Sequence, residues 1–138
     1  MLIVCVYVCV CGCTGGQFDV IVDDGGHNSM HILKTFEYMW PQLNPGGLYF
    51  IEDLHVQSGN IWYHPHYPVP ADVIQSWILT LLITHNTKSN RPPSYHMELE
   101  KDYPLPVGLA WIFCQAEACV LGKAGRGTRS HPWQLTRE

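Results

Sequence analysis

Residues 18–53 read FDVIVDDGGHNSMHILKTFEYMWPQLNPGGLYFIED, and this stretch decides the fold. Two short apolar runs, FDVIV at residues 18–22 and LYFI at residues 48–51, are typical of buried strands. Between them, apolar residues recur at helical spacing: Ile32, Leu33, Phe36, Met39 and Trp40. Strand, helix and strand together predict a βαβ unit with parallel strands and a right-handed crossover.

Turn and capping residues mark the boundaries of this unit. The glycine pair at residues 25–26 turns the chain after the first strand, and Asn28 or Ser29 can cap the helix. Pro41 ends the helix because it lacks a backbone donor and crowds the preceding turn. Residues 43–47, LNPGG, are typical of a turn before the second strand.

Acidic residues follow both strands of the unit. Because parallel strands end at the same edge of a sheet, Asp24, Glu52 and Asp53 are expected to converge there. Clustered carboxylates repel one another unless a cation neutralises them, and Mg²⁺ prefers oxygen ligands. His27 could then accept a proton as general base, and Asp23 could support the ligands or contact a cofactor. The alternative is structural, since Asp-Gly turns and Glu-Asp loop starts are common without a metal.

Composition indicates one small globular domain. The 138 residues are 46% apolar and 14% charged, which excludes a disordered chain. The net charge is −4 with scattered Lys and Arg, so nucleic acid and anionic membrane surfaces are not expected partners. The sequence assigns no compartment beyond a cytoplasmic default.

The six cysteines do not follow a zinc-binding spacing. Four lie within the first thirteen residues, and Cys114 and Cys119 lie far from them. The last two fall in apolar runs and are expected to be buried strand cysteines rather than reactive thiols. Nothing in this distribution requires an oxidising compartment.

Residues 1–16 form an apolar N-terminal segment of doubtful origin. MLIVCVYVCV has the β-branched content of a strand, and residues 2–10 could dock as a replacement strand on the edge of the strand at residues 18–22. Alternating Val and Cys is also what a translated dinucleotide repeat would give. A signal peptide is a third interpretation, although the segment lacks a basic start and is too short to span a bilayer.

The remaining segments complete an α/β pattern. Residues 54–70 predict a long loop that could cover a substrate, residues 71–84 a helix, and residues 86–93 a polar linker. Residues 109–114 and 118–121 predict an antiparallel strand pair at the far edge of the sheet. Residues 17–122 would form the folded domain, and residues 123–138 a loose tail.

Several other side chains carry weaker signals. His64 and His66 fit an exposed loop better than a metal site, and His31, four residues after His27, lacks the glutamate of a zinc motif. Three aromatic residues of the long loop could line an acceptor pocket or simply pack on the sheet: Trp62, Tyr63 and Tyr67.

The motif DDGGH, the helix and the run LNPGGLYFIEDL together resemble the metal-dependent O-methyltransferases of macrolide sugar tailoring, the macrocin and mycinamicin type. The resemblance covers about forty residues, with Gly26 standing where the family usually has serine. It implies the carboxyl-terminal half of a Rossmann-like class I methyltransferase fold, with a mostly parallel sheet and a terminal antiparallel strand pair. The family's glycine-rich cofactor loop has no counterpart before residue 18.

By position, the resemblance assigns Asp24, Glu52 and Asp53 as magnesium ligands, His27 as the general base and Asp23 as a neighbour of the methyl donor. The implied activity is Mg²⁺- and S-adenosylmethionine-dependent methylation of a sugar-like or other small-molecule hydroxyl. Two alternatives stay open: a non-catalytic remnant that keeps the metal, and a metal-assisted hydrolase. Self-association through the exposed sheet edge is also possible.

Overall fold

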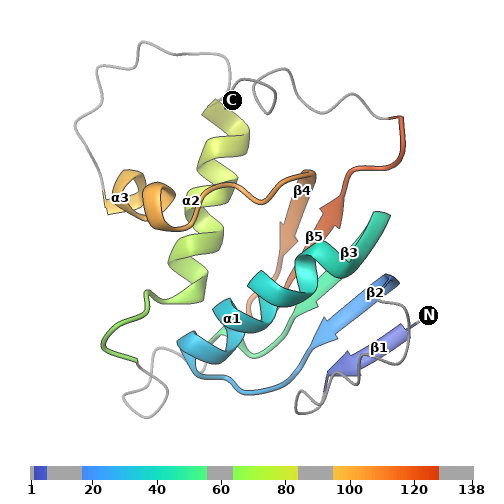
Figure 1. Cartoon of the computed structure of the whole chain (residues 1–138). Helices are drawn as coiled ribbons and strands as arrows, with labels where there is room; N and C mark the ends of the chain where they lie inside the picture. The colour runs from blue at the N-terminus through green and yellow to red at the C-terminus, as the bar shows by residue number, and fades with distance from the viewer. Residues whose placement is uncertain (1, 6–16, 56–63, 84–94, 128–138) are drawn as a thin grey trace.

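The computed structural model describes residues 2–5, 17–55, 64–83 and 95–127 (Figure 1). Its elements in chain order are β1 (Leu2–Cys5), β2 (Phe18–Asp23), α1 (Ser29–Met39), the 3₁₀ turn η1 (Trp40–Gln42), β3 (Leu43–Ile51), α2 (Pro70–Ile83), α3 (Tyr95–Asp102), β4 (Leu109–Cys114) and β5 (Cys119–Lys123).

The described strands form one five-stranded sheet in the order β1-β2-β3-β5-β4. The β1–β2 and β2–β3 junctions are parallel, whereas the β3–β5 and β5–β4 junctions are antiparallel. The expected antiparallel pair at one edge is therefore confirmed. The expectation of a mostly parallel sheet is not, because parallel and antiparallel junctions are equal in number and the sheet is mixed.

The predicted βαβ unit is confirmed as β2, α1 and β3. Asn28 caps α1, since its side-chain oxygen accepts a hydrogen bond from the backbone N–H of Met30 at 2.9 Å. Pro41 lies in η1, where the α-helix has already ended.

β3 begins earlier than the sequence predicts. Leu43 already pairs with Phe18, and the register shifts before Val20 pairs with Leu48. Gly46 accommodates this irregular start with a φ of 83°, a left-handed conformation that glycine adopts without steric cost. The turn predicted at residues 43–47 is thus the distorted first half of a strand.

β1 pairs in parallel with β2, from Leu2 opposite Val20 to Cys5 opposite Asp23. This is the replacement-strand arrangement expected for the N-terminal segment, here over four residues (Figure 1). Residues 6–16 lie outside the described part of the chain.

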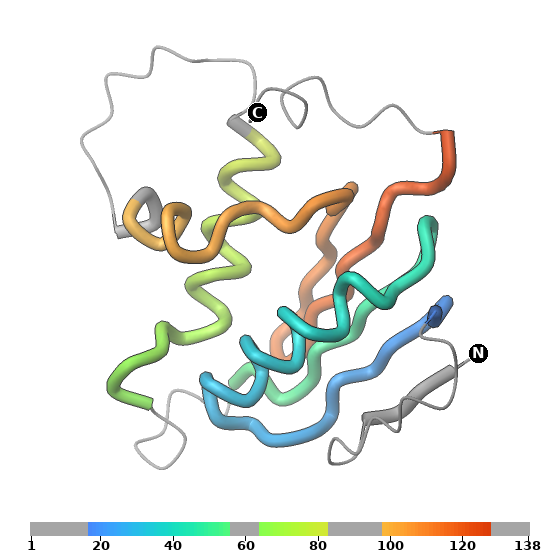
Figure 2. Tube along the Cα trace, in the orientation of Figure 1, coloured from blue at the N-terminus to red at the C-terminus, as the bar shows by residue number. Residues whose placement is uncertain are grey.

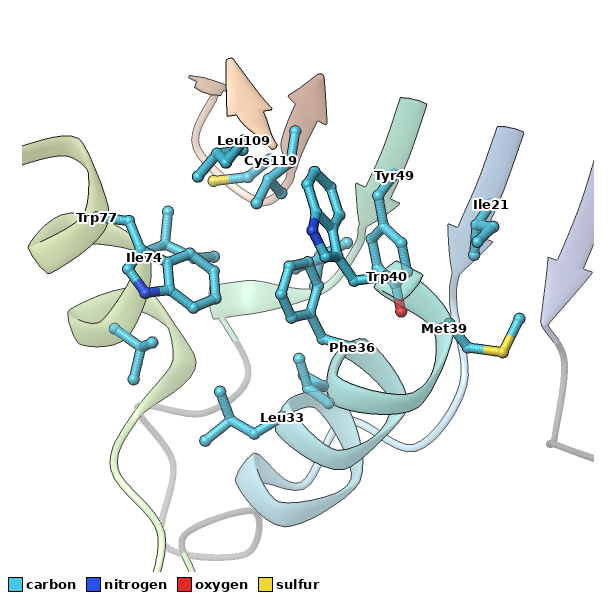
Figure 3. Close-up of a cluster of buried hydrophobic side chains, with 14 of the residues drawn as sticks. Ile21, Leu33, Phe36, Met39, Trp40, Tyr49, Ile74, Trp77, Leu109 and Cys119 are labelled. Carbon is cyan, nitrogen blue, oxygen red and sulfur yellow. The ribbon is translucent and has the colours of Figure 1, made fainter. Parts of the chain in front are cut away.

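The main core lies between the sheet and the helices α1 and α2 (Figure 3). Phe36 of α1 is its centre, because its ring contacts the rings of Trp40, Tyr49 and Trp77 at centroid distances of 5.0–5.2 Å. The aliphatic side chains around this cluster are buried: Ile21, Leu33, Ile51, Val73, Ile74 and Leu121.

Two tryptophans fasten the connection between α3 and β4. Trp77 Nε1 donates to the carbonyl of Tyr103 at 2.9 Å, and Trp40 Nε1 donates to that of Val107 at 3.0 Å. α3 itself was not predicted from the sequence. In both views it lies beside α2 (Figures 1 and 2).

The other face of the sheet is also apolar. Alternation along the strands turns two cross-strand rows of side chains away from the core. One row contains Val20, Leu48 and Trp111, and the other contains Val22, Phe50, Val120 and Phe113. Phe113 is 65% exposed, and within the described segments no helix covers this face.

Cys114 and Cys119 form a disulfide, which corrects the expectation of two buried free cysteines. The antiparallel register of β4 and β5 places them directly opposite each other, with a Cα–Cα distance of 4.1 Å. Cys119 is buried, as expected, but Cys114 is exposed. Among the described helices, none is both long and apolar enough to cross a membrane.

Candidate metal centre

The candidate site lies where β2 and β3 end side by side. Asp23, the last residue of β2, pairs with Ile51, and the backbone N–H of Glu52 donates to the carbonyl of Asp23 at 3.1 Å. The residues that follow both strands are therefore held at one edge of the sheet. The sequence predicts this arrangement of the two strand ends.

Three side chains meet at this edge and offer metal-ligating atoms. One atom each from Asp24, His27 and Asp53 lies within 4.8 Å of the other two, and all three residues are half-buried. His27 Nε2 is 3.5 Å from Asp53 Oδ2. Two carboxylates and an imidazole fit a divalent cation such as Mg²⁺ or Mn²⁺, whose other positions water or substrate oxygens can fill.

Glu52, also expected as a ligand, is exposed and contributes no atom to this group. His27, expected as the base, stands among the three instead. The roles of Glu52 as ligand and of His27 as base remain predictions.

Asp53 reaches the group through an unusual backbone conformation. Its φ is 53°, and it is the one non-glycine residue with positive φ in the described ranges. Aspartate tolerates this left-handed region better than most residues, yet such conformations persist only where surrounding contacts hold them. The next residue supplies one such contact, since the N–H of Leu54 donates to the carbonyl of Glu117 at 2.9 Å.

Asp23 faces the protein interior. Its side chain is 4% exposed, and Oδ2 accepts a hydrogen bond from the Tyr49 hydroxyl at 3.2 Å. Burial raises the pKa of Asp23 to about 6, because desolvation outweighs the hydrogen bonds from Tyr49 and the Gly25 N–H and the nearby His27. Its expected contact with a methyl donor remains a prediction.

Sequence reasoning missed Tyr49 as part of this region. A signal was available, because a tyrosine in a buried strand needs a partner for its hydroxyl. Asp23, one residue before the proposed ligand Asp24, is that partner.

Within the described segments, the histidines other than His27 lie outside the group. His31 is exposed on α1 and its ring covers Gly26, where a Cβ would come within 2.4 Å of Nδ1. His64 and His66 lie at a turn with their ring centroids 5.9 Å apart, as expected for a loop. Tyr67 packs against the core.

Trp62 and Tyr63 lie outside the described residues, as does most of the loop that was expected to cover the substrate.

No protein-family model matches this chain, but curated relatives do. It is 51% identical over 39 residues to the 8-demethyl-8-alpha-L-rhamnosyl tetracenomycin-C 2'-O-methyltransferase of Streptomyces olivaceus. This match covers 28% of this chain and 10% of the relative. It is 34% identical over 87 residues to the demethylmacrocin O-methyltransferase of Streptomyces fradiae. That match covers 63% of this chain and 20% of the relative. The chain thus spans a tenth to a fifth of these proteins.

A solved structure shows the same fold. The methyltransferase MycE of mycinamycin biosynthesis, in complex with Mg, SAH and mycinamycin VI, superposes with a TM-score of 0.58 at 21% identity. The match covers 89% of this chain and 30% of MycE. The fold is therefore that of an α/β methyltransferase, and the resemblance to macrocin- and mycinamicin-type O-methyltransferases is confirmed.

Proposed function

We propose that this chain carries the metal- and acceptor-binding part of a Mg²⁺- and S-adenosylmethionine-dependent O-methyltransferase that acts on a small-molecule hydroxyl. The observation that carries the proposal is the convergence of Asp24, His27 and Asp53 on one point at the carboxyl ends of adjacent parallel strands. The curated relatives, whose names describe O-methylation, in one case of a rhamnosyl tetracenomycin, support the reaction class. Because the chain spans so little of them, the activity of the whole enzyme is part of the proposal.

The carboxylates of Asp24 and Asp53 would hold the cation, with the adjacent Glu52 as a further carboxylate on the exposed side. A bound divalent ion lowers the pKa of a coordinated hydroxyl. His27 would take the hydroxyl proton at Nε2, and Asp53, 3.5 Å away, would stabilise the imidazolium that results.

The acceptor oxygen would form a bond to the methyl carbon of the donor as the carbon–sulfur bond breaks. The proton stays on His27 until solvent removes it. Asp23 would lie beside the methyl donor, as its place at the end of β2 suggests.

Titration calorimetry with Mg²⁺ and Mn²⁺ tests the site. We expect Asp24→Asn to weaken binding by at least tenfold, because it removes a charged ligand. Glu98→Gln is the matched control, since it neutralises an exposed carboxylate on α3. Unchanged divalent affinity in Asp24→Asn would show that the site is assigned wrongly.

Two further measurements separate the roles. His27→Gln should keep metal affinity if His27 is the base and should lose it if His27 is a ligand. Titration with S-adenosylmethionine in millimolar Mg²⁺ distinguishes an enzyme from a remnant. Binding of the donor supports the proposal. A protein that binds the metal but not the donor favours the non-catalytic alternative.

A further inference from the structure

The β4–β5 hairpin adjoins the candidate metal centre. β5 pairs with β3 as far as Cys119 opposite Ile51, the last residue of β3. Three residues after Ile51, the N–H of Leu54 donates to the carbonyl of Glu117 in the hairpin turn. The hairpin therefore holds the chain on both sides of residues 52–53, and Asp53 lies between these two attachments.

This bracketing bears directly on the conformation of Asp53. A left-handed aspartate relaxes to an extended or helical conformation unless its neighbours are fixed. Relaxation would turn the carboxylate away from Asp24 and His27, since side-chain direction follows the backbone. The geometry of the three-residue group depends on the hairpin turn staying in place.

Few contacts close the turn itself. The N–H of Gln115 donates to the carbonyl of Ala118 at 2.9 Å, and residues 115–117 are exposed. Immediately behind this bond, the disulfide joins Cys114 to Cys119. The covalent link fixes the end of the hairpin whose carbonyl at Glu117 accepts the hydrogen bond from Leu54.

The disulfide is also open to reduction. Cys114 is exposed at the end of the edge strand β4, so a thiolate can reach it from solvent, whereas Cys119 belongs to the core. A surface-accessible disulfide that supports a ligand-binding backbone is suited to sensing thiol reductants.

We propose that the Cys114–Cys119 disulfide positions Asp53, so that divalent-cation binding at the centre is strong when the pair is oxidised and weak when it is reduced. This inference rests on the proposed metal centre. A dithiol supplies two electrons and two protons: the Cys114–Cys119 bond breaks, two thiols form, and the dithiol is oxidised to its own disulfide. Cys114 and Cys119 act through the backbone and are positioning residues, not ligands.

The test compares Mn²⁺ affinity in the two redox states, followed by electron paramagnetic resonance of free Mn²⁺. The protein carries Cys5→Ser, Cys9→Ser, Cys11→Ser and Cys13→Ser, so that only one cysteine pair remains. One sample is kept oxidised, and the other is reduced with dithiothreitol and desalted anaerobically. Mass spectrometry after alkylation reports the thiol state, and circular dichroism reports folding.

We expect the reduced sample to stay folded, to bind Mn²⁺ roughly tenfold more weakly, and to recover on reoxidation, as for loss of other groups that orient metal ligands. A Cys114→Ala/Cys119→Ala variant should bind weakly in both conditions. Equal affinity in both states would overturn this inference while leaving the metal centre intact. So would free thiols at Cys114 and Cys119 in the purified protein, or global unfolding on reduction. An oxidised protein that binds neither Mn²⁺ nor Mg²⁺ would instead disprove the proposed function.

Discussion

The hydroxyl of Tyr49, near the end of β3, donates a hydrogen bond to Oδ2 of Asp23, the last residue of β2, over 3.2 Å. Both side chains are almost completely buried, so the contact joins an ionisable group to the aromatic core beneath the candidate centre. Asp23 is next to Asp24 in sequence, but its carboxyl faces the protein interior and not the candidate metal centre. Its titration is therefore a property of the fold that can be measured without any ligand.

Asp23→Asn should change how stability depends on pH. Burial raises the pKa of Asp23 from an ordinary value of 3.8 to about 6, so the folded state favours the protonated carboxyl. A raised carboxyl pKa gives stability that is complete below pH 4 and is lost as pH rises through 6. Asn, which stays neutral, should be more stable than wild type above pH 7, by at most about 3 kcal/mol, and similar at pH 4. Urea unfolding of both proteins at pH 4.5 and 7.5 measures the difference. If the free energy of unfolding changed equally with pH in the two proteins, the prediction would be refuted.

Tyr49→Phe should destabilise the fold in a pH-dependent way. Removing the hydroxyl leaves the buried carboxylate with one donor fewer, at a cost of about 1–2 kcal/mol, and the cost is larger when Asp23 is ionised. The destabilisation measured by urea unfolding should thus be greater at pH 7.5 than at pH 4.5. In an Asp23→Asn background this pH dependence should disappear. If it persists there, the Tyr49 hydroxyl acts through another group.

Asp53→Asn and Glu52→Gln should differ in metal affinity. Asp53 offers an oxygen to the three-residue group and Glu52 does not, so we expect a loss of at least roughly tenfold for Asp53→Asn and a smaller loss for Glu52→Gln. The pair is well matched, because each change removes one charge from neighbouring positions. Calorimetric titration with Mn²⁺ measures both. Equal losses would contradict the prediction and would show that Glu52 contributes to ion binding as strongly as Asp53 does.

Lys123→Met should destabilise the protein although it removes a side chain near the end of the described chain. Lys123 Nζ donates to the carbonyls of Trp40 at 3.0 Å and Leu43 at 2.8 Å, and it lies 5.5 Å from the centroid of the Trp40 ring. Its loss leaves carbonyls that follow α1 without this donor, at a cost of about 1–3 kcal/mol. Lys101→Met, an exposed change on α3, is the control. A similar midpoint of urea unfolding for the two variants would show that the contact adds no stability.

The βαβ unit could be predicted because its signals are local and agree with one another. Asn28 caps α1, Pro41 follows its end, and the apolar spacing of Phe36 and its neighbours places one face on the sheet. α3 was missed because Tyr95–Asp102 is mostly polar and follows two prolines. The early start of β3 was missed because Asn44 to Gly47 have turn chemistry, which pairing with β2 overrides.

The site was predictable to the level of the sheet edge but not to the level of side-chain direction. Parallel strand ends explain why Asp24 and Asp53 meet. Asp53, which joins the group where Glu52 does not, has a left-handed backbone, and the N–H of the next residue is held by a hairpin more than sixty residues away. The pairing of Cys114 with Cys119 likewise follows from strand register, which spacing alone does not specify.

Because of the two apolar rows on the far side of the sheet, the two faces of the sheet should tolerate substitutions differently. Residues such as Ile21 and Leu121 carry the interior, and shortening any of them opens a void. Their immediate neighbours Val22 and Val120 belong to the outward rows. Substitution by threonine there keeps the preference for a strand and makes the surface more polar. Solubility can therefore be engineered on one side of this sheet without touching the architecture that its other side maintains.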